Sequence, residues 1–241
     1  MQKIINKILV ENISLQYQNK KILSNVSFSV SENQTVALMG KSGIGKSSLI
    51  KIIAGLQNPS SGKIKLNHNN YPSVMFQTPL LQPWMTVKDN IELPAKISGI
   101  KKDCSDLLID LGLQNLEKYY PWQLSGGQQR RVALARAIIM NPEILLLDEP
   151  FTGVDEITSE RLYDLLSNII SNRKITCIIS THNLYEAIFL ADTIIILGGQ
   201  PASIKITHNI SIKKEKGKDI RKNMYFMQEV VKLREIISSI L

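Results

Sequence analysis

The chain has 241 residues, of which 44% are hydrophobic and 21% are charged, and its formal net charge is +8. This length suits one large α/β domain, or a core with a small subdomain. No apolar run approaches the roughly 18 residues that a membrane-spanning helix needs. The N-terminal stretch MQKIINKILVEN also lacks an apolar segment long enough for a signal peptide. The composition therefore predicts a soluble globular chain.

The positive charge is concentrated at the end of the sequence. From residue 205 onward, nine Lys and Arg residues oppose four Asp and Glu residues, so this segment carries +5 of the +8. A solvated charged face is the favoured interpretation, and attraction to anionic lipid is the alternative. Nucleic acid is disfavoured because no aromatic residues are interleaved with the charges. The basic stretch KKEKGKDIRK precedes a predicted helix with apolar residues at Ile220, Met224, Met227 and Val231.

The cysteines and two of the histidines carry no motif. Cys104 and Cys177 lack metal-ligand or redox spacing, so we expect two thiols in a reducing compartment. His68 and His208 lie in polar stretches, and we predict no role for them.

Strand patterns of two kinds follow along the chain. Short continuous apolar runs, which are typical of buried parallel strands, are TVALM, ILLL, TCIIS and TIIIL. A period of two instead predicts half-buried antiparallel strands. That period occurs at Ile13, Leu15 and Tyr17, at Val26, Phe28 and Val30, and at Ile64 and Leu66.

A helical stretch is predicted from Thr86 to about Gln123. Thr86 and Asp89 have the spacing of a capping box. Pro94 and Gly99 interrupt the stretch, so we expect several short helices.

The segment GKSGIGKSS fits G-x-x-x-x-G-K-[ST] and lies between a predicted strand and a predicted helix. Its glycines allow backbone N–H groups to surround phosphates, Lys46 supplies positive charge, and the Ser47 hydroxyl suits Mg²⁺. A dinucleotide-binding turn is excluded because Ser48 occupies its last glycine position. The predicted nucleotide-binding residues are Gly40, Lys41, Ser42, Gly43, Ile44, Gly45, Lys46, Ser47 and Ser48.

Acidic and imidazole side chains follow two of the apolar runs. Asp148 ends ILLLD, where the ligand crevice of an open α/β sheet lies, and is the predicted Mg²⁺ partner. Glu149 is the predicted general base that polarises water, and a surface acid is the alternative. His182 in STHN is a predicted γ-phosphate contact, and a structural histidine is the alternative.

The stretch LSGGQQ precedes a strong helix-forming segment. Ser125 is a suitable N-cap. Gly126 and Gly127 go further than a cap requires, because they remove side chains from a helix N-terminus that attracts anions. The stretch therefore predicts contact between backbone and phosphate.

These motifs, in this order, resemble the ATP-binding subunit of ATP-binding-cassette (ABC) transporters over about residues 8–197. The resemblance implies an ATP- and Mg²⁺-dependent ATPase of the α/β class: a P-loop NTPase core with a mixed sheet, an N-terminal antiparallel β subdomain and an inserted α-helical subdomain. Within one domain, it assigns 1–80 and 130–204 to the nucleotide-binding core, 81–129 to the helical signature subdomain, and 205–241 to a basic extension.

The resemblance also implies residue roles. Tyr17 would stack on adenine, or is alternatively an ordinary strand residue. Gln77 would sense metal and water beside Ser47 and Asp148, and Asp155 would communicate across a head-to-tail dimer. One subunit would cover the γ-phosphate held by Lys46 of the other with its signature residues Leu124, Ser125, Gly126, Gly127 and Gln128.

The implied branch is that of nitrate, sulfonate and taurine importers, which FQTPLLQPWMTVKDNI and HNLYEAIFLAD resemble. Two departures are Gln128, where that group often has methionine, and FTGVD, which replaces a small-Ala-Leu-Asp pattern. An exporter or lipid-transport ATPase is the alternative. A nucleic-acid-associated ABC protein is less favoured, because those usually carry two cassettes or a coiled coil, and this chain has one cassette and no heptads.

The implied partners are a second copy or a homologous ATPase subunit, separate integral membrane permease subunits and a solute-binding protein, with no nucleic acid. The implied location is cytoplasmic, peripheral on the inner face of the cell membrane. Pro83, Trp84 and Met85 form an apolar cluster that we expect to dock on the membrane partner, and a small internal core is the alternative.

Overall fold

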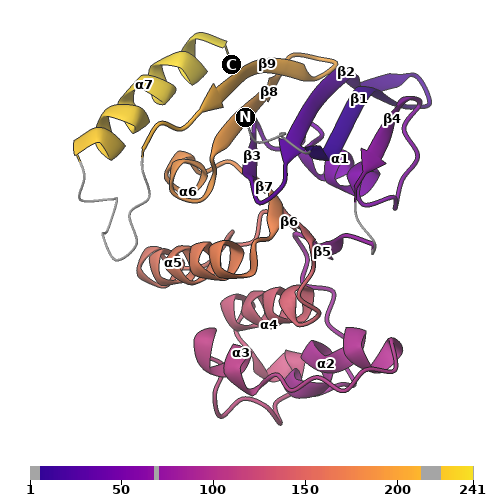
Figure 1. The fold of residues 1–241 in the computed structure, drawn as a ribbon, viewed down its shortest axis with the longest axis vertical. Coiled ribbons are helices and arrows are strands. Elements are labelled where there is room, and N and C mark those ends of the chain that lie inside the picture. The colour runs from indigo at the N-terminus through magenta and orange to yellow at the C-terminus, as the bar shows by residue number, and fades with distance from the viewer. Residues whose placement is uncertain (1–5, 68–70, 213–223, 241) are drawn as a thin grey trace. The chain divides into compact units, whose positions relative to one another are not determined.

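The computed structural model describes residues 6–67, 71–212 and 224–240 (Figure 1). His68, Ile220 and the KKEKGKDIRK stretch lie outside the described residues. The chain divides into two compact units, the first made of residues 1–69 with 176–241 and the second of residues 70–175. Among the described residues, no helix has the length and apolar character needed to cross a membrane.

The first unit begins with an antiparallel sheet. It contains β1 (Asn6–Tyr17), β2 (Lys20–Ser31) and β4 (Ser61–Leu66), in the order β2-β1-β4. Both pairings are antiparallel, as the alternating sequence pattern predicted. The alternation places four apolar side chains in the core, namely Ile13, Leu15, Val26 and Val30.

The same unit contains mixed strands in the order β7-β3-β8-β9. β3 (Thr35–Met39) pairs in parallel with β7 (Thr176–Thr181) and β8 (Thr193–Gly198), and β9 (Ser203–Asn209) is antiparallel to β8. Every residue of β3, β7 and β8 is buried, as the continuous apolar runs predicted. Met39 and Thr181 are register partners, so the segments that follow β3 and β7 leave the sheet at the same edge.

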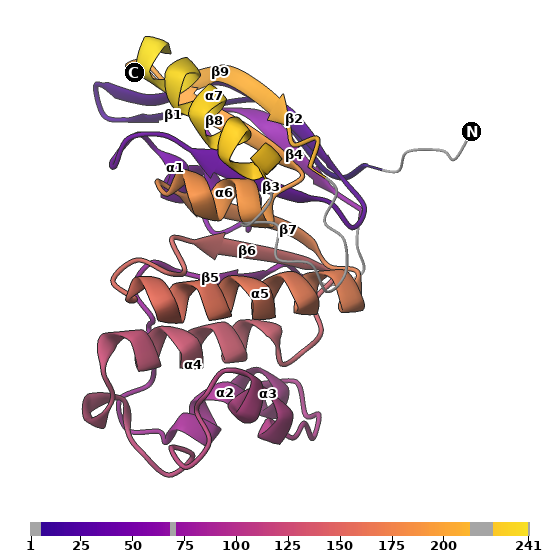
Figure 2. The same cartoon turned by 90° about the vertical axis from the view of Figure 1, so that its left-hand side faces the viewer.

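Three helices complete the described part of the first unit: α1 (Lys46–Ile53), α6 (Leu184–Leu190) and α7 (Met224–Ile240). Figure 2 shows α7 running beside α6 and β9. The predicted C-terminal helix is confirmed, but the apolar residues that it buries are not those that the sequence pattern singled out. Phe226, Val230 and Leu233 are buried, whereas Met224, Met227 and Val231 are exposed.

Two contacts between side chains hold α7 against its neighbours. The Phe226 ring lies 6.1 Å from the Tyr185 ring of α6, centroid to centroid. Glu229 of α7 contacts the Nε2 atom of His208 on β9. His208, to which the sequence assigned no role, therefore helps to position the C-terminal helix.

The second unit has a short parallel pair, β5 (Ser73–Met75) with β6 (Ile144–Asp148), and four α-helices among its described residues. As expected, several short helical elements lie between Thr86 and Gln123. Thr86 caps the first of them by accepting a hydrogen bond from the Asp89 N–H at 3.1 Å. The helical elements are α2 (Val87–Ile97), α3 (Ser105–Asp110), the 3-10 turn Pro121–Gln123, α4 (Gly126–Ile138) and α5 (Glu156–Arg173).

Asn90 fixes the turn that precedes α2. Its side chain is fully buried. The side-chain oxygen accepts a hydrogen bond from Gln82 N at 2.7 Å, and the amide nitrogen contacts the carbonyl oxygens of Gln82, Met85 and Thr86 at 3.0–3.1 Å. One polar side chain thus satisfies the backbone of the turn that carries Pro83 to Met85.

The Asn90→Leu variant should be destabilised by about 3 kcal/mol, because the buried backbone groups of the turn lose their partner while the side-chain volume is kept. Urea unfolding at 25 °C measures this change. The matched control is Asn172→Leu, at an exposed asparagine of α5. Equal unfolding free energies in the two variants would contradict the structural role of Asn90.

Candidate functional site

Residues 40–45 join β3 to α1 in a backbone conformation that requires glycine, and with the first residues of α1 they form the phosphate loop. Gly40 has φ of 151°, and a Cβ atom there would lie 2.7 Å from the Leu197 carbonyl oxygen. Gly45 has φ of 115°, and its Cβ atom would lie 2.8 Å from the Leu23 side chain. The two glycines therefore serve the close packing of the loop against its own unit.

Lys46 is the buried cation of this loop, with 5% of its surface exposed. Its ammonium donates hydrogen bonds to the carbonyl oxygens of Gly40 at 2.9 Å and Lys41 at 3.3 Å. α1 begins at Lys46 with neither a side-chain cap nor an acidic residue in its first turn. Its N-terminal N–H groups and the lysine charge together form a cradle suited to phosphate, so the loop fits a nucleotide.

His182 follows β7 at the edge where the phosphate loop follows β3, and its side chain is exposed. The residues on both sides of it are fixed. Thr181 donates to the Glu186 carboxylate at 2.9 Å and accepts from the Asn183 N–H at 2.9 Å, and Asn183 caps α6. The structure thus brings His182 to the same sheet edge as the phosphate loop.

Tyr17 is the last residue of β1, and half of its surface is exposed. Its hydroxyl accepts a hydrogen bond from the Gln57 side chain at 2.7 Å. An exposed ring with its hydroxyl fixed offers a face on which a planar base could stack.

In the second unit, the predicted catalytic residues Gln77 and Glu149 are in contact. Asp148 is the buried last residue of β6, and Glu149 follows it with φ of 48°, in the left-handed region. The Glu149 carboxylate accepts hydrogen bonds from Gln77 at 3.3 Å and from the Thr152 hydroxyl at 3.1 Å. A non-glycine residue in this conformation is a feature that clusters at functional sites. Thr152 belongs to no motif, so the sequence carries no signal for this contact.

The helix α4 begins with the predicted N-cap. The Ser125 hydroxyl accepts from the Gln128 N–H at 3.3 Å, and the Gln128 side chain accepts from the Ser125 N–H at 2.8 Å. Gln128, which departs from the pattern of the resembled group, thus completes a capping box. The Ser125 hydroxyl can still donate its proton to an oxygen acceptor.

Gly126 and Gly127 are not required by the packing of this unit. Neither has a positive φ. A Cβ atom at Gly126 would meet nothing within 4 Å, and one at Gly127 would make an ordinary 3.9 Å contact with Val154. These two glycines keep a helix N-terminus uncovered without serving the chain's own interior.

Arg136 links α4 to the segment that follows Gln77. Its guanidinium donates to the carbonyl oxygens of Pro79 at 2.7 Å and Leu80 at 2.9 Å. Burial lowers the pKa of Arg136 from its usual value. The sequence showed no signal for this contact, because it joins an ordinary helix position to backbone carbonyls 56 and 57 residues away.

The loop Phe151–Asp155, which departs from the resembled pattern, has its own internal supports. Phe151 is buried and packs edge-on against Tyr163, with ring centroids 4.9 Å apart. Gly153 has φ of 75°, a conformation suited to glycine. Asp155 caps α5 by accepting from the Thr158 N–H at 2.9 Å, and this bond holds the pKa of Asp155 below its usual value.

The apolar cluster at 83–85 faces solvent at Trp84, whose side chain is 70% exposed. The alternative of a small internal core is therefore wrong for Trp84. In the same unit, Tyr120 and Trp122 are also exposed, and their rings stack with centroids 6.2 Å apart.

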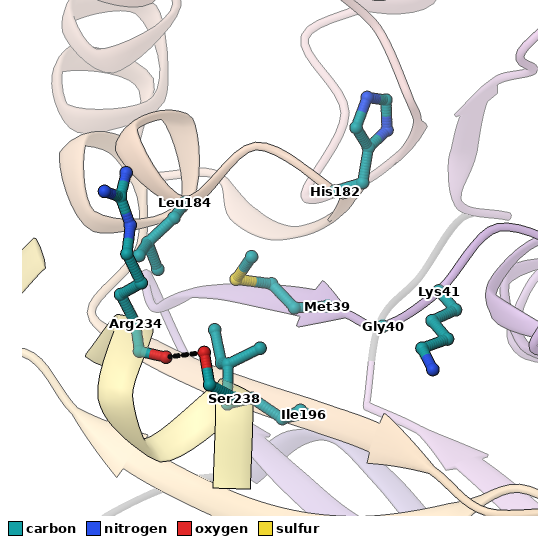
Figure 3. Close-up of a pocket in the computed structure, with 9 residues that line it drawn as sticks. Met39, Gly40, Lys41, His182, Leu184, Ile196, Arg234 and Ser238 are labelled. Atoms are coloured by element: carbon teal, nitrogen blue, oxygen red, sulfur yellow. Dashed lines mark hydrogen bonds between the residues drawn. The ribbon is translucent and has the colours of Figure 1, made fainter. Parts of the chain in front are cut away.

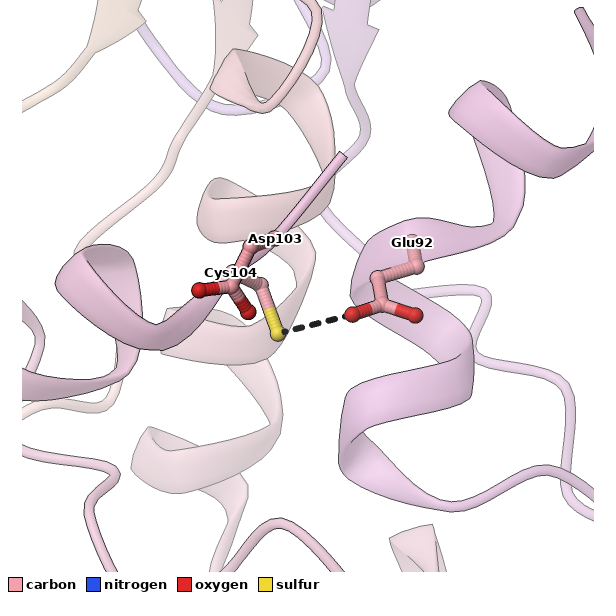
Figure 4. Close-up of side chains that lie close together, drawn as sticks. All are labelled: Glu92, Asp103 and Cys104. Atoms are coloured by element: carbon pink, nitrogen blue, oxygen red, sulfur yellow. Dashed lines mark hydrogen bonds between the residues drawn. The ribbon is translucent and has the colours of Figure 1, made fainter. Parts of the chain in front are cut away.

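A separate cluster joins Glu92, Asp103 and Cys104, with ligand atoms within 4.8 Å of one another (Figure 4). Burial and the neighbouring Glu92 charge raise the pKa of Cys104 to about 12, so its thiol stays protonated and donates to Glu92 at 3.6 Å. Lys88 and Lys96 lie 3.8 Å and 3.7 Å from the Glu92 carboxylate. This local neutralisation disfavours a metal ion. The cluster instead joins α2 to the start of α3. Burial also raises the pKa of Cys177.

Comparisons with known proteins agree with these features. The profile of the ABC transporter family matches residues 23–152. An uncharacterized ABC transporter ATP-binding protein of Methanocaldococcus jannaschii is 35% identical over an alignment of 246 positions, and the alignment covers 96% of this chain and 91% of the relative. The aliphatic sulfonates import ATP-binding protein SsuB of Bacillus licheniformis is 40% identical over 191 residues, 76% of this chain and 75% of that protein.

Among solved structures, a dimeric post-hydrolysis state of the ATP-binding cassette MJ0796 bound to ADP and Pi superposes with a TM-score of 0.78 at 27% identity. The match covers 86% of this chain and 100% of that one. The likeness extends to the fold that the sequence motifs implied, with a mixed sheet and an antiparallel N-terminal sheet.

The Lys46→Ala variant should lose detectable ATP binding, a reduction of about a hundredfold or more, because the lysine neutralises the ground-state triphosphate. Equilibrium titration with a fluorescent ATP analogue measures the affinity. The control is Lys51→Ala, an exposed lysine in the last turn of the same helix, which should bind as wild type does. Wild-type affinity in Lys46→Ala would disprove the assignment.

Proposed function

Because the chain belongs to the ABC transporter family, as an ATP-binding subunit, we propose that it hydrolyses ATP and couples hydrolysis to transport across a membrane. The proposal rests most directly on one observation, the contact of Glu149 with Gln77 and Thr152 beside the buried Asp148. A carboxylate held in this way at a strand end is positioned to act on water.

The proposed chemistry gives each side chain a separate role. Lys46 and the N–H groups of its loop hold the triphosphate, and Tyr17 stacks on the adenine. Glu149 accepts a proton from the attacking water, while Gln77 and Thr152 orient its carboxylate.

The Mg²⁺ ion, when bound, neutralises charge that develops on the phosphates. The hydroxyl, amide and carboxylate oxygens that would hold it are hard ligands of the kind that it prefers. They belong to Ser47, Gln77 and Asp148, with His182 as the proposed γ-phosphate contact.

We propose a head-to-tail dimer with a second copy or a homologous subunit. The support is the open surroundings of Gly126 and Gly127, which nothing in their own unit explains. A triphosphate held by the partner could approach these bare N–H groups and the Ser125 hydroxyl. The similar cassette MJ0796 is described as dimeric, which supports a dimer. Asp155 would then lie on a loop that communicates between the subunits.

We further propose that the transported compound is a small solute taken up by an importer. Several relatives at 36–40% identity are named for aliphatic sulfonate import, which supports this direction and this class of solute. The proposed partners are separate permease subunits in the membrane and a solute-binding protein. The chain would then be peripheral on the cytoplasmic face, with the exposed Trp84 turn against the permease.

The Glu149→Gln variant should form an ATP-trapped dimer. Glutamine is nearly isosteric but cannot accept the proton, so turnover should fall by about 10²–10⁴-fold. ATP that binds only the dimer then favours it by mass action. Size-exclusion chromatography with light scattering, with and without Mg·ATP, measures the assembly.

The matched control is Glu143→Gln, at an exposed acid immediately before β6, which should leave turnover and assembly unchanged. Near wild-type turnover in Glu149→Gln would remove Glu149 from the catalytic residues. Loss of turnover without an ATP-dependent dimer would contradict the head-to-tail arrangement alone.

The Trp84→Ala variant should keep its stability and its basal ATPase rate, because the side chain is largely exposed, but lose most transport-coupled ATPase activity. The measurement compares both rates in the complex with its membrane subunits. The control is Ile157→Ala, which removes an exposed apolar side chain from α5. Cysteine crosslinking from Gln82 and Lys88 tests the same surface. Equal coupling in Trp84→Ala and the control would contradict docking through this turn.

A further inference from the structure

A pocket of about 300 Å³ lies in the unit formed by residues 1–69 and 176–241, directly beside the phosphate loop (Figure 3). Its apolar lining comes from four elements of that unit. Met39 ends β3, Leu184 begins α6, Ile196 lies in β8 and Ile237 lies in α7. Met39 and Ile196 are buried, so the pocket has a fixed apolar floor.

Basic side chains surround this floor. Arg234 of α7 stands on one side in Figure 3, Lys41 and His182 stand on the other, and Met39 lies between them. The fourth polar side chain is that of Ser238, whose hydroxyl donates to the Arg234 carbonyl oxygen at 2.9 Å. No acidic residue is among the described residues that line the pocket. The pocket is therefore complementary to negative charge.

The wall contributed by α7 is held in place independently of any ligand. Its residues Phe226, Val230 and Leu233 are buried, and Leu233 directly precedes the pocket-lining Arg234. Glu229 of the same helix contacts His208 of β9. Arg234, Ile237 and Ser238 are three and four residues apart, so the helix presents them on one face. The fold thus presents Arg234 to a preformed pocket.

We propose that this pocket binds a small organic anion with a short apolar tail, at a site that adjoins the phosphate loop and shares Lys41 and His182 with the proposed nucleotide site. The tail would lie on Met39, Ile196 and Leu184, and the charged head would accept hydrogen bonds from the basic rim. Its volume is at the lower end of the roughly 300–1,000 Å³ found for small-ligand sites. A larger multiply charged nucleotide does not suit this apolar floor.

Binding at this pocket would act on ATP binding, because the two sites share side chains. Lys41 belongs to the phosphate loop, and His182 is the proposed γ-phosphate contact. An anion bound in the pocket beside them would repel the triphosphate, so each ligand would weaken the other by the same factor. This effect on ATP rests on the proposed function, whereas binding of the anion does not.

Isothermal titration calorimetry on the full chain without nucleotide tests the site, with sodium hexanesulfonate and sodium hexanoate as probes. Both should bind at one site per chain. 1-Hexanol lacks the charge and methanesulfonate lacks the tail, so each should bind at least about tenfold more weakly. Absence of saturable binding by both six-carbon anions, or equal binding of 1-hexanol, would overturn the proposal.

Variants locate the binding. Arg234→Ala should weaken hexanesulfonate binding about tenfold, and Ser238→Trp, at an exposed rim position, should block the pocket. The matched control is Lys232→Ala, at an exposed lysine of α7 that does not line the pocket, and it should bind normally. Equal affinities in Arg234→Ala, Ser238→Trp and Lys232→Ala would overturn this location.

Lys46→Ala separates the two sites. This variant should lose the fluorescent ATP analogue but retain hexanesulfonate, and loss of both ligands would show that the anion occupies the nucleotide site instead. In the wild-type chain, saturating hexanesulfonate should weaken the ATP analogue about tenfold, and ATP should weaken hexanesulfonate equally. Unchanged ATP affinity at saturating hexanesulfonate would overturn the coupling. Failure of the wild-type chain to bind the ATP analogue would instead count against the proposed function.

Discussion

A triphosphate can be held at close range only where backbone N–H groups are not covered by side chains, and this constraint explains two different kinds of glycine in the chain. Gly40 and Gly45 lie where a Cβ atom would collide with the chain's own backbone or side chains. Gly126 and Gly127 lie where it would meet almost nothing. The first pair shapes a loop from within. The second pair leaves a helix N-terminus uncovered without serving internal packing, which is the physical basis for proposing a partner's nucleotide there.

The parallel strands of the first unit bring residues that are far apart in the sequence close together in space. Because β3 and β7 pair in register from Thr35 with Cys177 to Met39 with Thr181, the residues after them emerge at one edge. This arrangement was predictable, since the apolar runs and the motifs that follow them were both legible in the sequence. The same logic predicted Asp148 at the end of β6. Residues whose function depends on ending a buried strand are the part of the site that a sequence reveals best.

Supporting residues were less predictable, for reasons that differ from case to case. Thr152 acts through a hydroxyl on the Glu149 carboxylate, and a threonine in a loop carries no pattern. Arg136 donates to distant backbone carbonyl oxygens, and because every residue has a carbonyl group, the sequence does not reveal such a partner. Gln128 departs from the resembled group, yet its spacing from Ser125 is that of a capping box. Spacing rules would have found Gln128, but neither of the others.

The C-terminal helix carries two apolar stripes, so hydrophobic periodicity alone does not predict which of them is buried. Met224, Met227 and Val231 fit helical spacing, yet the helix buries a different stripe because β9 and α6 offer aromatic and charged contacts on that side. The choice of stripe turns Arg234 toward the pocket beside the phosphate loop. Lys46 hydrogen-bonds the carbonyl oxygens of Gly40 and Lys41, and these two residues also line the pocket. A ligand in the pocket would therefore meet the phosphate loop at the residues whose carbonyl oxygens Lys46 contacts, so the C-terminal helix could influence the loop through that ligand.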